Sequence, residues 1–244
     1  MLFRSPAPAT GQATVRLVAY NVKHGLGMDE RIDLERVADV LRPLDADVIT
    51  LQEIDVGVER SARVDQAEAL GRLLDMDAFF GDFMPYQGGE YGMAVLTRLP
   101  VQDVRNIRLP DGAEPRTSLA VTVEAQGGVL LTVAGIHLYR TPEERLAQAE
   151  VLSDAFDGSE QPVALVGDFN SRRGDIVLDH LVGEGWHVLD KTGSALTYPS
   201  DIPAREIDFV MLRPASAFEV LEHRVIPESL ASDHRPLLAV LRMW

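Results

Sequence analysis

The feature that most constrains this fold is a repeated pattern in which a short run of buried-strand residues ends abruptly in polar side chains. Four such runs occur: LVAY stands before Asn21, VITL before Gln52 and Glu53, LTVAGI before His137, and VALVG before Asp168. Short apolar runs of this kind are typical of strands that are buried on both faces. Because a buried charge must be paired or must bind a metal, polar residues at the ends of such strands are expected to meet in a crevice.

Further polar residues adjoin strand-like runs elsewhere in the chain. Asn170 follows Asp168 by two residues, Asp208 precedes FVML, and Asp233 with His234 precedes PLLAV. A solvent-facing acid, an Asx-turn or a structural histidine would explain any one of them. Six such sites in one chain favour a shared pocket over unrelated explanations. Their oxygen-rich chemistry suits Mg²⁺ or Mn²⁺, and zinc through histidine stays possible although no HExxH motif is present.

Strand-like and helical segments alternate along the chain without a linker-like break. Residues 126–128 (QGG) predict a hairpin, and Thr141 before Pro142 predicts a helix cap. Strands joined both by hairpins and by helices indicate an α/β (α+β) fold of stacked sheets with helices outside, in one domain over residues 15–244. Residues 1–14 are expected to form a flexible leader. Strands are predicted at 16–22, 47–54, 93–97, 118–125, 129–138, 162–169, 207–212, 218–225 and 236–241, and helices at 31–44, 62–74, 142–156 and 176–181.

Composition narrows the class of protein and of partner. The 244 residues are 46% hydrophobic, enough for a large core, and contain no cysteine, which excludes disulfides and thiolate metal sites. No signal-like segment or membrane-spanning apolar run is visible, which predicts a soluble, cytoplasmic protein. The net charge of −15 and the low aromatic content of 6% disfavour a nucleic-acid surface and favour a small molecule or lipid headgroup as the partner.

Five segments in order, VAYNVKHG, ITLQEID, VALVGDFNS, REIDFV and SDHRP, resemble the motifs of the endonuclease/exonuclease/phosphatase superfamily. That superfamily includes deoxyribonuclease I, abasic-site endonucleases, neutral sphingomyelinases and inositol polyphosphate 5-phosphatases. The resemblance runs from about residue 16 to residue 241. It implies a four-layered sandwich of two mixed β-sheets flanked by helices, with a divalent-metal site at one edge.

The resemblance also implies which residues form the metal site and the substrate pocket. Asn21, Glu53 and Asp233 match the metal-binding positions, with Mg²⁺ or Mn²⁺ as the cofactor. Tyr91 falls in a tyrosine-containing stretch found in several branches. Three arginines stand next to motif segments and could bind phosphate bidentately, although a solvated surface role is the alternative for each: Arg60, Arg116 and Arg205.

Five further residues match catalytic positions. Asp168 and Asn170 resemble the pair that orients the attacking water and contacts the phosphate. His234 resembles the histidine that contacts the scissile phosphate, with Asp208 as its supporting carboxylate. His137 stands where a histidine can assist the leaving group or stabilise the phosphorane.

The sequence therefore predicts a divalent-metal-dependent hydrolase that cleaves a phosphodiester or phosphomonoester by in-line attack of water. A DNA endonuclease or exonuclease is the first alternative, and a catalytically silent binding module on the same scaffold is the second. The full set of acids and histidines argues against the silent module. No Walker motif, GxSxG elbow or dinucleotide fingerprint is present. A monomer is favoured.

Overall fold

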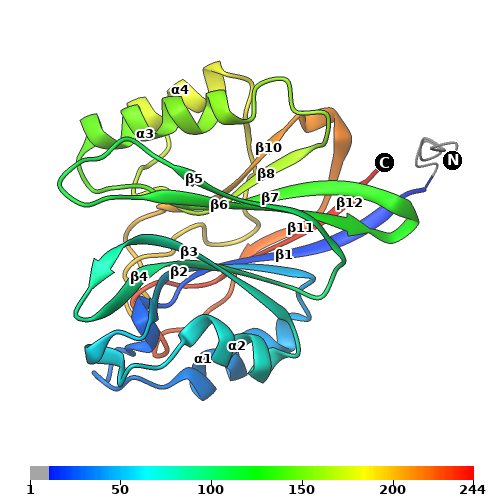
Figure 1. Cartoon of the computed structure of the whole chain (residues 1–244). Helices are drawn as coiled ribbons and strands as arrows, with labels where there is room; N and C mark the ends of the chain where they lie inside the picture. The colour runs from blue at the N-terminus through cyan, green and yellow to red at the C-terminus, as the bar shows by residue number, and fades with distance from the viewer. Residues whose placement is uncertain (1–10) are drawn as a thin grey trace, which may run out of the picture.

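Two six-stranded β-sheets stack face to face in the computed structural model, which describes residues 11–244 (Figure 1). In spatial order, the first sheet contains β11 (Phe218–Val225), β12 (Leu237–Met243), β1 (Ala13–Asn21), β2 (Val48–Val56), β4 (Gly89–Thr97) and β3 (Asp77–Tyr86). The second contains β5 (Val101–Arg108), β6 (Thr117–Ala125), β7 (Val129–His137), β8 (Val163–Asp168), β10 (Asp208–Arg213) and β9 (His187–Val188). Both sheets are mixed, because β1 is parallel to β2 and β7 is parallel to β8, while the other neighbouring strands are antiparallel.

Helices cover the outer face of each sheet. Helices α1 (Leu34–Leu41) and α2 (Gln66–Leu74) pack on the first sheet, and α3 (Pro142–Ala155) and α4 (Ile176–Gly183) pack on the second (Figure 1). The predicted four-layered sandwich of two mixed sheets flanked by helices is therefore confirmed. Short 3₁₀ turns complete the fold: η1 (Lys23–Gly25), η2 (Arg42–Leu44), η3 (Glu59–Ser61), η4 (Gln126–Gly128) and η5 (Ala215–Ala217).

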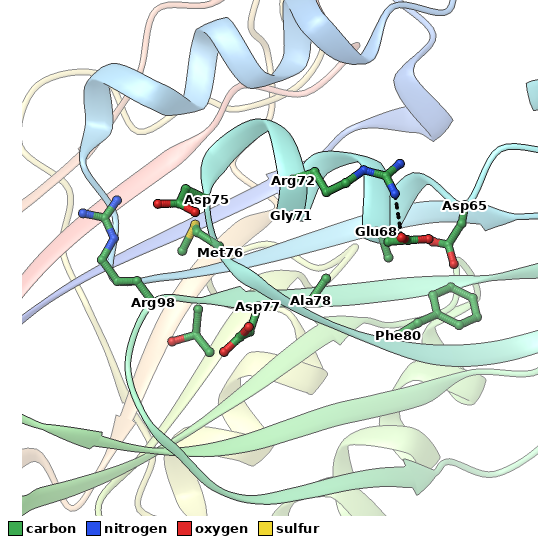
Figure 2. A pocket seen from close by; sticks show the side chains of 12 residues that line it. Asp65, Glu68, Gly71, Arg72, Asp75, Met76, Asp77, Ala78, Phe80 and Arg98 are labelled. Carbon is green, nitrogen blue, oxygen red and sulfur yellow. Dashed lines mark hydrogen bonds and ion pairs between the residues drawn. The ribbon is translucent and has the colours of Figure 1, made fainter.

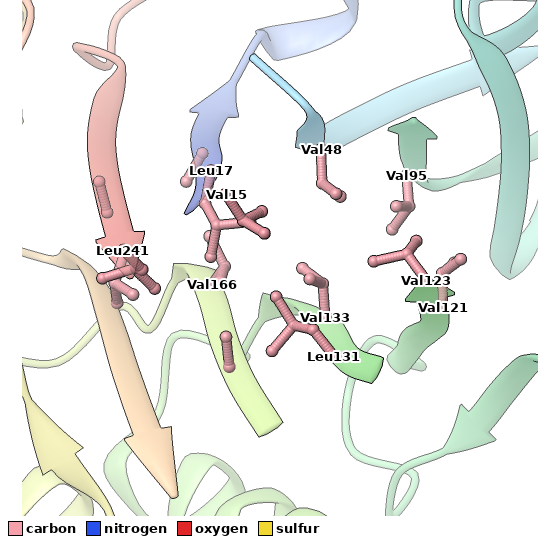
Figure 3. Close-up of a cluster of buried hydrophobic side chains, with 14 of the residues drawn as sticks. Val15, Leu17, Val48, Val95, Val121, Val123, Leu131, Val133, Val166 and Leu241 are labelled. Atoms are coloured by element: carbon pink, nitrogen blue, oxygen red, sulfur yellow. The ribbon is translucent and has the colours of Figure 1, made fainter. Parts of the chain in front are cut away.

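Side-chain alternation along the strands produces three separate apolar layers. Along β1, Val15 and Leu17 point between the sheets, whereas Val18 and Tyr20 point toward α1 and α2. Figure 3 shows the inter-sheet layer, in which valines and leucines of both sheets meet. A third layer lies under α3 and α4. Because the central strands of each sheet are buried on both faces, they read as continuous apolar runs in the sequence.

The predicted strands are found with small shifts at their ends, and three further strands are added: β3, β5 and β9. Two predicted helices are shorter than expected at their N-terminal ends. Helix α1 begins after Asp33, whose side chain accepts the Arg36 N–H at 3.0 Å, and α2 begins after Asp65, whose side chain accepts the Glu68 N–H at 2.9 Å. An aspartate cap fixes the start of a helix because it satisfies a free backbone donor. Thr141 does precede α3, but its hydroxyl bonds the Glu144 carboxylate and makes no capping bond to the backbone.

The predicted leader over residues 1–14 extends too far. Strand β1 begins at Ala13, which is buried and pairs with Met243 of β12. Residues 1–10 of that prediction lie outside the described residues. Among residues 11–244, no helix has the length and apolarity needed to span a lipid bilayer.

A hollow of about 800 Å³ lies between α2 and β3 (Figure 2). Acidic and basic side chains line it together, and Arg72 is paired with Glu68 at 2.6 Å. None of the site residues predicted from the sequence lines this hollow. Size alone therefore does not locate the functional site.

Gly167 lies on β8 in close contact with β7 and with the first sheet. A Cβ atom there would lie 2.2 Å from the carbonyl oxygen of Ile136 and 2.9 Å from Nε2 of Gln52, and the residue has φ of +146°. Only glycine avoids this overlap. The absence of a side chain at Gly167 thus lets Gln52 of the first sheet pack against β8, directly before Asp168.

We expect the substitution Gly167→Ala to lower the free energy of unfolding by about 2–3 kcal/mol, because the new methyl group must displace backbone atoms. Gly183, at the end of α4, is the matched control, since a Cβ atom there has no neighbour within 4 Å. Gly183→Ala should be neutral or slightly stabilising. Urea denaturation of both variants measures the difference, and equal effects would contradict the packing argument.

Candidate active site

Three predicted site residues lie side by side at one end of the second sheet. In the parallel pair β7–β8, His137 stands opposite Asp168, and in the antiparallel pair β8–β10, Asp168 stands opposite Asp208. All three side chains are buried. The register of the sheet therefore places two carboxylates and an imidazole in one row, with Asp168 in the centre.

Glu53 reaches this row from the first sheet because β2 contains a β-bulge. The pairing of β2 with β4 shifts register between Gln52 and Ile54, and Glu53 itself has φ of 61°. A non-glycine residue with positive φ is uncommon, and such residues cluster at functional sites. The bulge removes Glu53 from the alternation of the strand, so Gln52 is fully buried while the Glu53 carboxylate faces Asn21.

Asn21 joins the acids of the two sheets. Its Nδ2 donates to Glu53 Oε1 at 3.1 Å and to Asp168 Oδ2 at 3.2 Å, while its Oδ1 accepts the backbone N–H of Lys23 at 3.1 Å. The amide oxygen, which is the atom able to bind a metal, has a second lone pair besides the one that accepts this N–H. Asn21 thus orients both carboxylates, and its role as a metal ligand stays a prediction.

His234 is held by a carboxylate, as the sequence predicts. Its Nδ1 lies 3.0 and 3.2 Å from the two carboxylate oxygens of Asp208, and its Nε2 lies 3.7 Å from Asp168 Oδ2. The Tyr198 ring packs against the imidazole with the ring centroids 4.9 Å apart. The Asp208 contact fixes the ring and leaves the Nε2–H directed to Asp168 and the pocket.

Neighbouring carboxylates affect the pKa of His234 more strongly than its burial does. Burial alone would lower the pKa of His234, but the carboxylates of Asp208 and Asp168 raise it to about 10. Burial raises the pKa of Asp168 to about 7, against the lowering effect of His234. The pair therefore contains an imidazolium and an acid whose pKa lies near neutrality, which is the range in which a carboxylate transfers protons most effectively.

His137 behaves differently although it contacts the same acid. Its Nε2 lies 3.6 Å from Asp168 Oδ2, beyond hydrogen-bond distance. Burial lowers the pKa of His137 well below its usual value, and the neighbouring Arg116 lowers it further. His137 is therefore a neutral imidazole beside Asp168.

Asp233 lies at the rim of the same site and is paired with a lysine. Lys23 Nζ lies 3.0 Å from Asp233 Oδ2, with the two side chains 35% and 21% exposed. Burial alone would lower the pKa of Lys23, but Asp233 raises it above its usual value. The rim thus carries a formed ion pair beside Glu53.

A cavity of about 390 Å³ opens over these groups. Its lining contains nine of the predicted residues: Glu53, Tyr91, Arg116, His137, Asp168, Asn170, Arg205, Asp233 and His234. Asn21 and Asp208 stand behind this lining and contact it through Glu53, Asp168 and His234. Arg60 lies in an adjoining cavity of about 130 Å³ that shares Tyr91 and Glu114 with the main one.

Two of the predicted arginines are each held by a carboxylate and an aromatic ring. Arg60 donates from Nε and Nη2 to the buried Asp55, both at 2.8 Å, and its guanidinium lies 4.7 Å from the centroid of the Tyr86 ring. Arg116 is buried, bonds Glu114, and lies over the Phe83 ring at 4.8 Å. Both guanidinium groups are thus oriented by a carboxylate and an aromatic face.

Four residues of the cavity are absent from the sequence prediction: Glu114, Arg140, Tyr198 and Ile207. Arg140 and Tyr198 belong to connections between strands and helices, where no strand-end pattern exists. Arg140 stands three residues beyond His137, and this proximity to a motif is the only signal that could have found it. The walls of the cavity are therefore harder to predict than its floor.

The donor set fits a hard divalent cation. Glu53, Asp168 and Asp233 present carboxylates to one cavity, and burial raises the pKa of Glu53. Asp168, Asp208 and His234 also offer ligand atoms within 4.8 Å of one another. The imidazolium of His234 repels a cation, so Glu53 and Asp233 are the better candidate ligands.

Comparison with known proteins agrees with this geometry. The model of the Endonuclease/Exonuclease/phosphatase family matches residues 18–234. The chain belongs to this family. The resemblance of the five sequence motifs is thereby confirmed, and members of the family are hydrolases that act on phosphoester bonds.

Three relatives illustrate how far the similarity extends. The uncharacterized protein YbhP of Escherichia coli is 28% identical over 96% of this chain and 98% of its own length. The family member from Beutenbergia cavernae is 23% identical, with a TM-score of 0.77 over 95% of this chain and 72% of that one. The mannosyl-6-phosphatase of Bacteroides thetaiotaomicron is 17% identical, with a TM-score of 0.75 over 93% of this chain and 99% of that one. These structural likenesses concern the fold.

We expect Asp208→Asn to lower the pKa of His234 from about 10, because the substitution removes its closest carboxylate. The pKa of His234 in the folded state exceeds its usual value of 6.5. The stabilisation of the folded state by protonated His234 is therefore fully present below pH 6.5 and is lost as the pH rises toward 10. NMR titration of the imidazole in EDTA measures the pKa. Urea unfolding measures the free energy of unfolding at pH 6 and at pH 9.5, and its decrease between these pH values should be smaller in the variant than in the wild type. An unchanged His234 pKa would contradict this assignment.

Proposed function

We propose that this protein is a divalent-metal-dependent phosphoesterase that cleaves a phosphomonoester or phosphodiester of a small molecule or lipid headgroup by attack of water. The observation that carries the proposal is the convergence of Glu53, Asp168 and His234 on one cavity from both sheets. Mg²⁺ or Mn²⁺ held by Glu53 and Asp233 would offset the charge on the phosphate oxygens. Asn21 supports this arrangement by orienting Glu53 and Asp168.

The other side chains of the site have separate roles in the proposed reaction. Asp168, with a pKa near neutrality, accepts a proton from the attacking water. Asn170 is held beside it, because its backbone N–H donates to Asp168 Oδ1 at 2.8 Å and its Nδ2 donates to the Leu138 carbonyl at 2.9 Å. His234 presents a charged N–H that stabilises negative charge on the phosphate. His137 supplies a neutral imidazole on the other side of Asp168.

The walls favour a compact substrate. The cavity of about 390 Å³ has Arg116, Arg140 and Arg205 on its lining, which suits an anionic ester. The net charge of −15 disfavours a long polyanion. One protein of the same fold is a mannosyl-6-phosphatase, which supports phosphate monoesters of small alcohols as the first substrates to test. A cytoplasmic location and a monomeric state remain predictions.

We expect Glu53→Gln and Asp168→Asn each to lower kcat/KM by about 100-fold or more, because each removes a charge that acts in the transition state. The matched control is Asp77→Asn, since Asp77 is exposed on β3 and lines the separate hollow of Figure 2. Circular dichroism checks that all variants fold. A Glu53 or Asp168 variant that retains most of the wild-type rate would overturn the proposal.

A substrate panel separates the alternatives. Purified protein with Mg²⁺ or Mn²⁺ is assayed on p-nitrophenyl phosphate, bis-p-nitrophenyl phosphate, sugar phosphates, sphingomyelin, supercoiled plasmid and abasic duplex, each with EDTA as control. We expect EDTA-sensitive hydrolysis of the small esters. Plasmid nicking at physiological salt would favour the DNA nuclease, and inactivity on every substrate would favour the silent binding module.

A further inference from the structure

Lysine is nearly absent from this chain, and both lysines form ion pairs close to the candidate site. The sequence has 21 arginines but only Lys23 and Lys191. Lys191 Nζ lies 2.7 Å from Glu206, two residues before Asp208, and Lys23 Nζ lies 3.0 Å from Asp233. A lysine ammonium is a compact point charge, unlike the planar guanidinium of arginine. The ammonium of Lys23 is therefore a compact cation placed on one of the candidate metal ligands.

The backbone holds Lys23 in place beside the acids. Lys23 has φ of 47° and its N–H donates to Asn21 Oδ1, the residue that orients the two carboxylates. His24, with φ of 45°, offers its carbonyl to Gln66 Nε2 at 2.8 Å. Two consecutive left-handed residues form a tight turn that is fixed from both sides. The backbone from which the Lys23 side chain extends is thus fixed beside the acids, and its ammonium lies on Asp233.

Asp233 cannot serve two cations equally well. The Lys23 ammonium lies at Oδ2 of Asp233, and its charge also acts on Glu53. A divalent cation bound by Glu53 and Asp233 would be repelled by this ammonium at close range. Either the lysine leaves Asp233 when the metal binds, or the metal binds more weakly because the lysine stays.

We propose that Lys23 is a resident counter-ion of Asp233, which a divalent cation must displace, and that this lysine sets the cation affinity of the site. The inference rests on the proposed function for its assignment of Glu53 and Asp233 as ligands. Lys23 keeps the acidic rim neutral in the metal-free protein. Metal binding then releases the ammonium toward the mouth of the cavity.

Calorimetric titration of the metal-free protein with MgCl₂, without substrate, tests the affinity. We expect Lys23→Gln to bind Mg²⁺ about tenfold more tightly than the wild type, because one opposing charge at close range is removed. Arg98→Gln is the matched control. It also removes one positive charge from an aspartate, since Arg98 lies 2.6 Å from Asp45 beside the hollow of Figure 2, and its effect should stay within about twofold.

NMR of protein labelled with ¹³C at lysine Cε tests the displacement directly. Two lysine signals are expected, and the Lys23→Gln spectrum assigns them by the loss of one. On addition of Mg²⁺ the Lys23 signal should move and saturate at the concentration found by calorimetry. The Lys191 signal, whose ammonium stays on Glu206, should remain in place as an internal control.

Each outcome bears on a separate claim. Equal Mg²⁺ affinity of wild type and Lys23→Gln, or an unmoved Lys23 signal at saturating Mg²⁺, would overturn the inference and leave the proposed function intact. Absence of Mg²⁺ binding to both proteins would overturn both. Tighter binding by the variant, together with no phosphoesterase activity on any substrate, would support the inference and overturn the function.

Discussion

Hydrogen bonds from one asparagine join the acidic ends of the two sheets. Asn21 ends β1 in the first sheet and donates to Asp168 at the end of β8 in the second, while it also holds Glu53. A second bond between the sheets, from Thr50 Oγ1 to the Val166 carbonyl at 3.1 Å, lies in the layer below. In both of these bonds between the sheets the donor and the acceptor are buried, so each group depends on the opposite sheet for its hydrogen-bond partner. The relative position of the two sheets at this end is therefore tied to the geometry of the acids.

The acids that meet at this end of the two sheets need positive charges close to them. Glu53, Asp168, Asp208 and Asp233 stand close together around one cavity, which is unfavourable without cations. The imidazolium of His234 compensates the acids of the second sheet, and Lys23 compensates Asp233 at the rim. Among the described residues Glu53 forms no ion pair, and its hydrogen-bond donor is the amide of Asn21, so it is the acid with the strongest demand for a metal ion.

Much of the fold and of the cavity floor could be predicted from the sequence, because strands buried on both faces give apolar runs with polar ends. Strand β5 escaped prediction because it is an exposed edge strand of mostly polar residues, and β3 because a bulge between Asp82 and Met84 breaks its alternation. No residue pattern reveals the positive φ of Glu53 or the pairing of Lys23 with Asp233. Those features depend on strand register and on contacts between distant segments, which spacing alone does not encode.

The division between the floor and the walls of the cavity has a consequence for how such proteins diversify. The floor is built from strand ends locked by register, whereas Glu114, Arg140 and Arg205 come from three separate connections: between β5 and β6, after β7, and before β10. Connections tolerate exchange and insertion far better than paired strands do. Grafting these three connections between relatives should thus transfer the choice of alcohol group while the hydrolytic machinery beneath stays as it is.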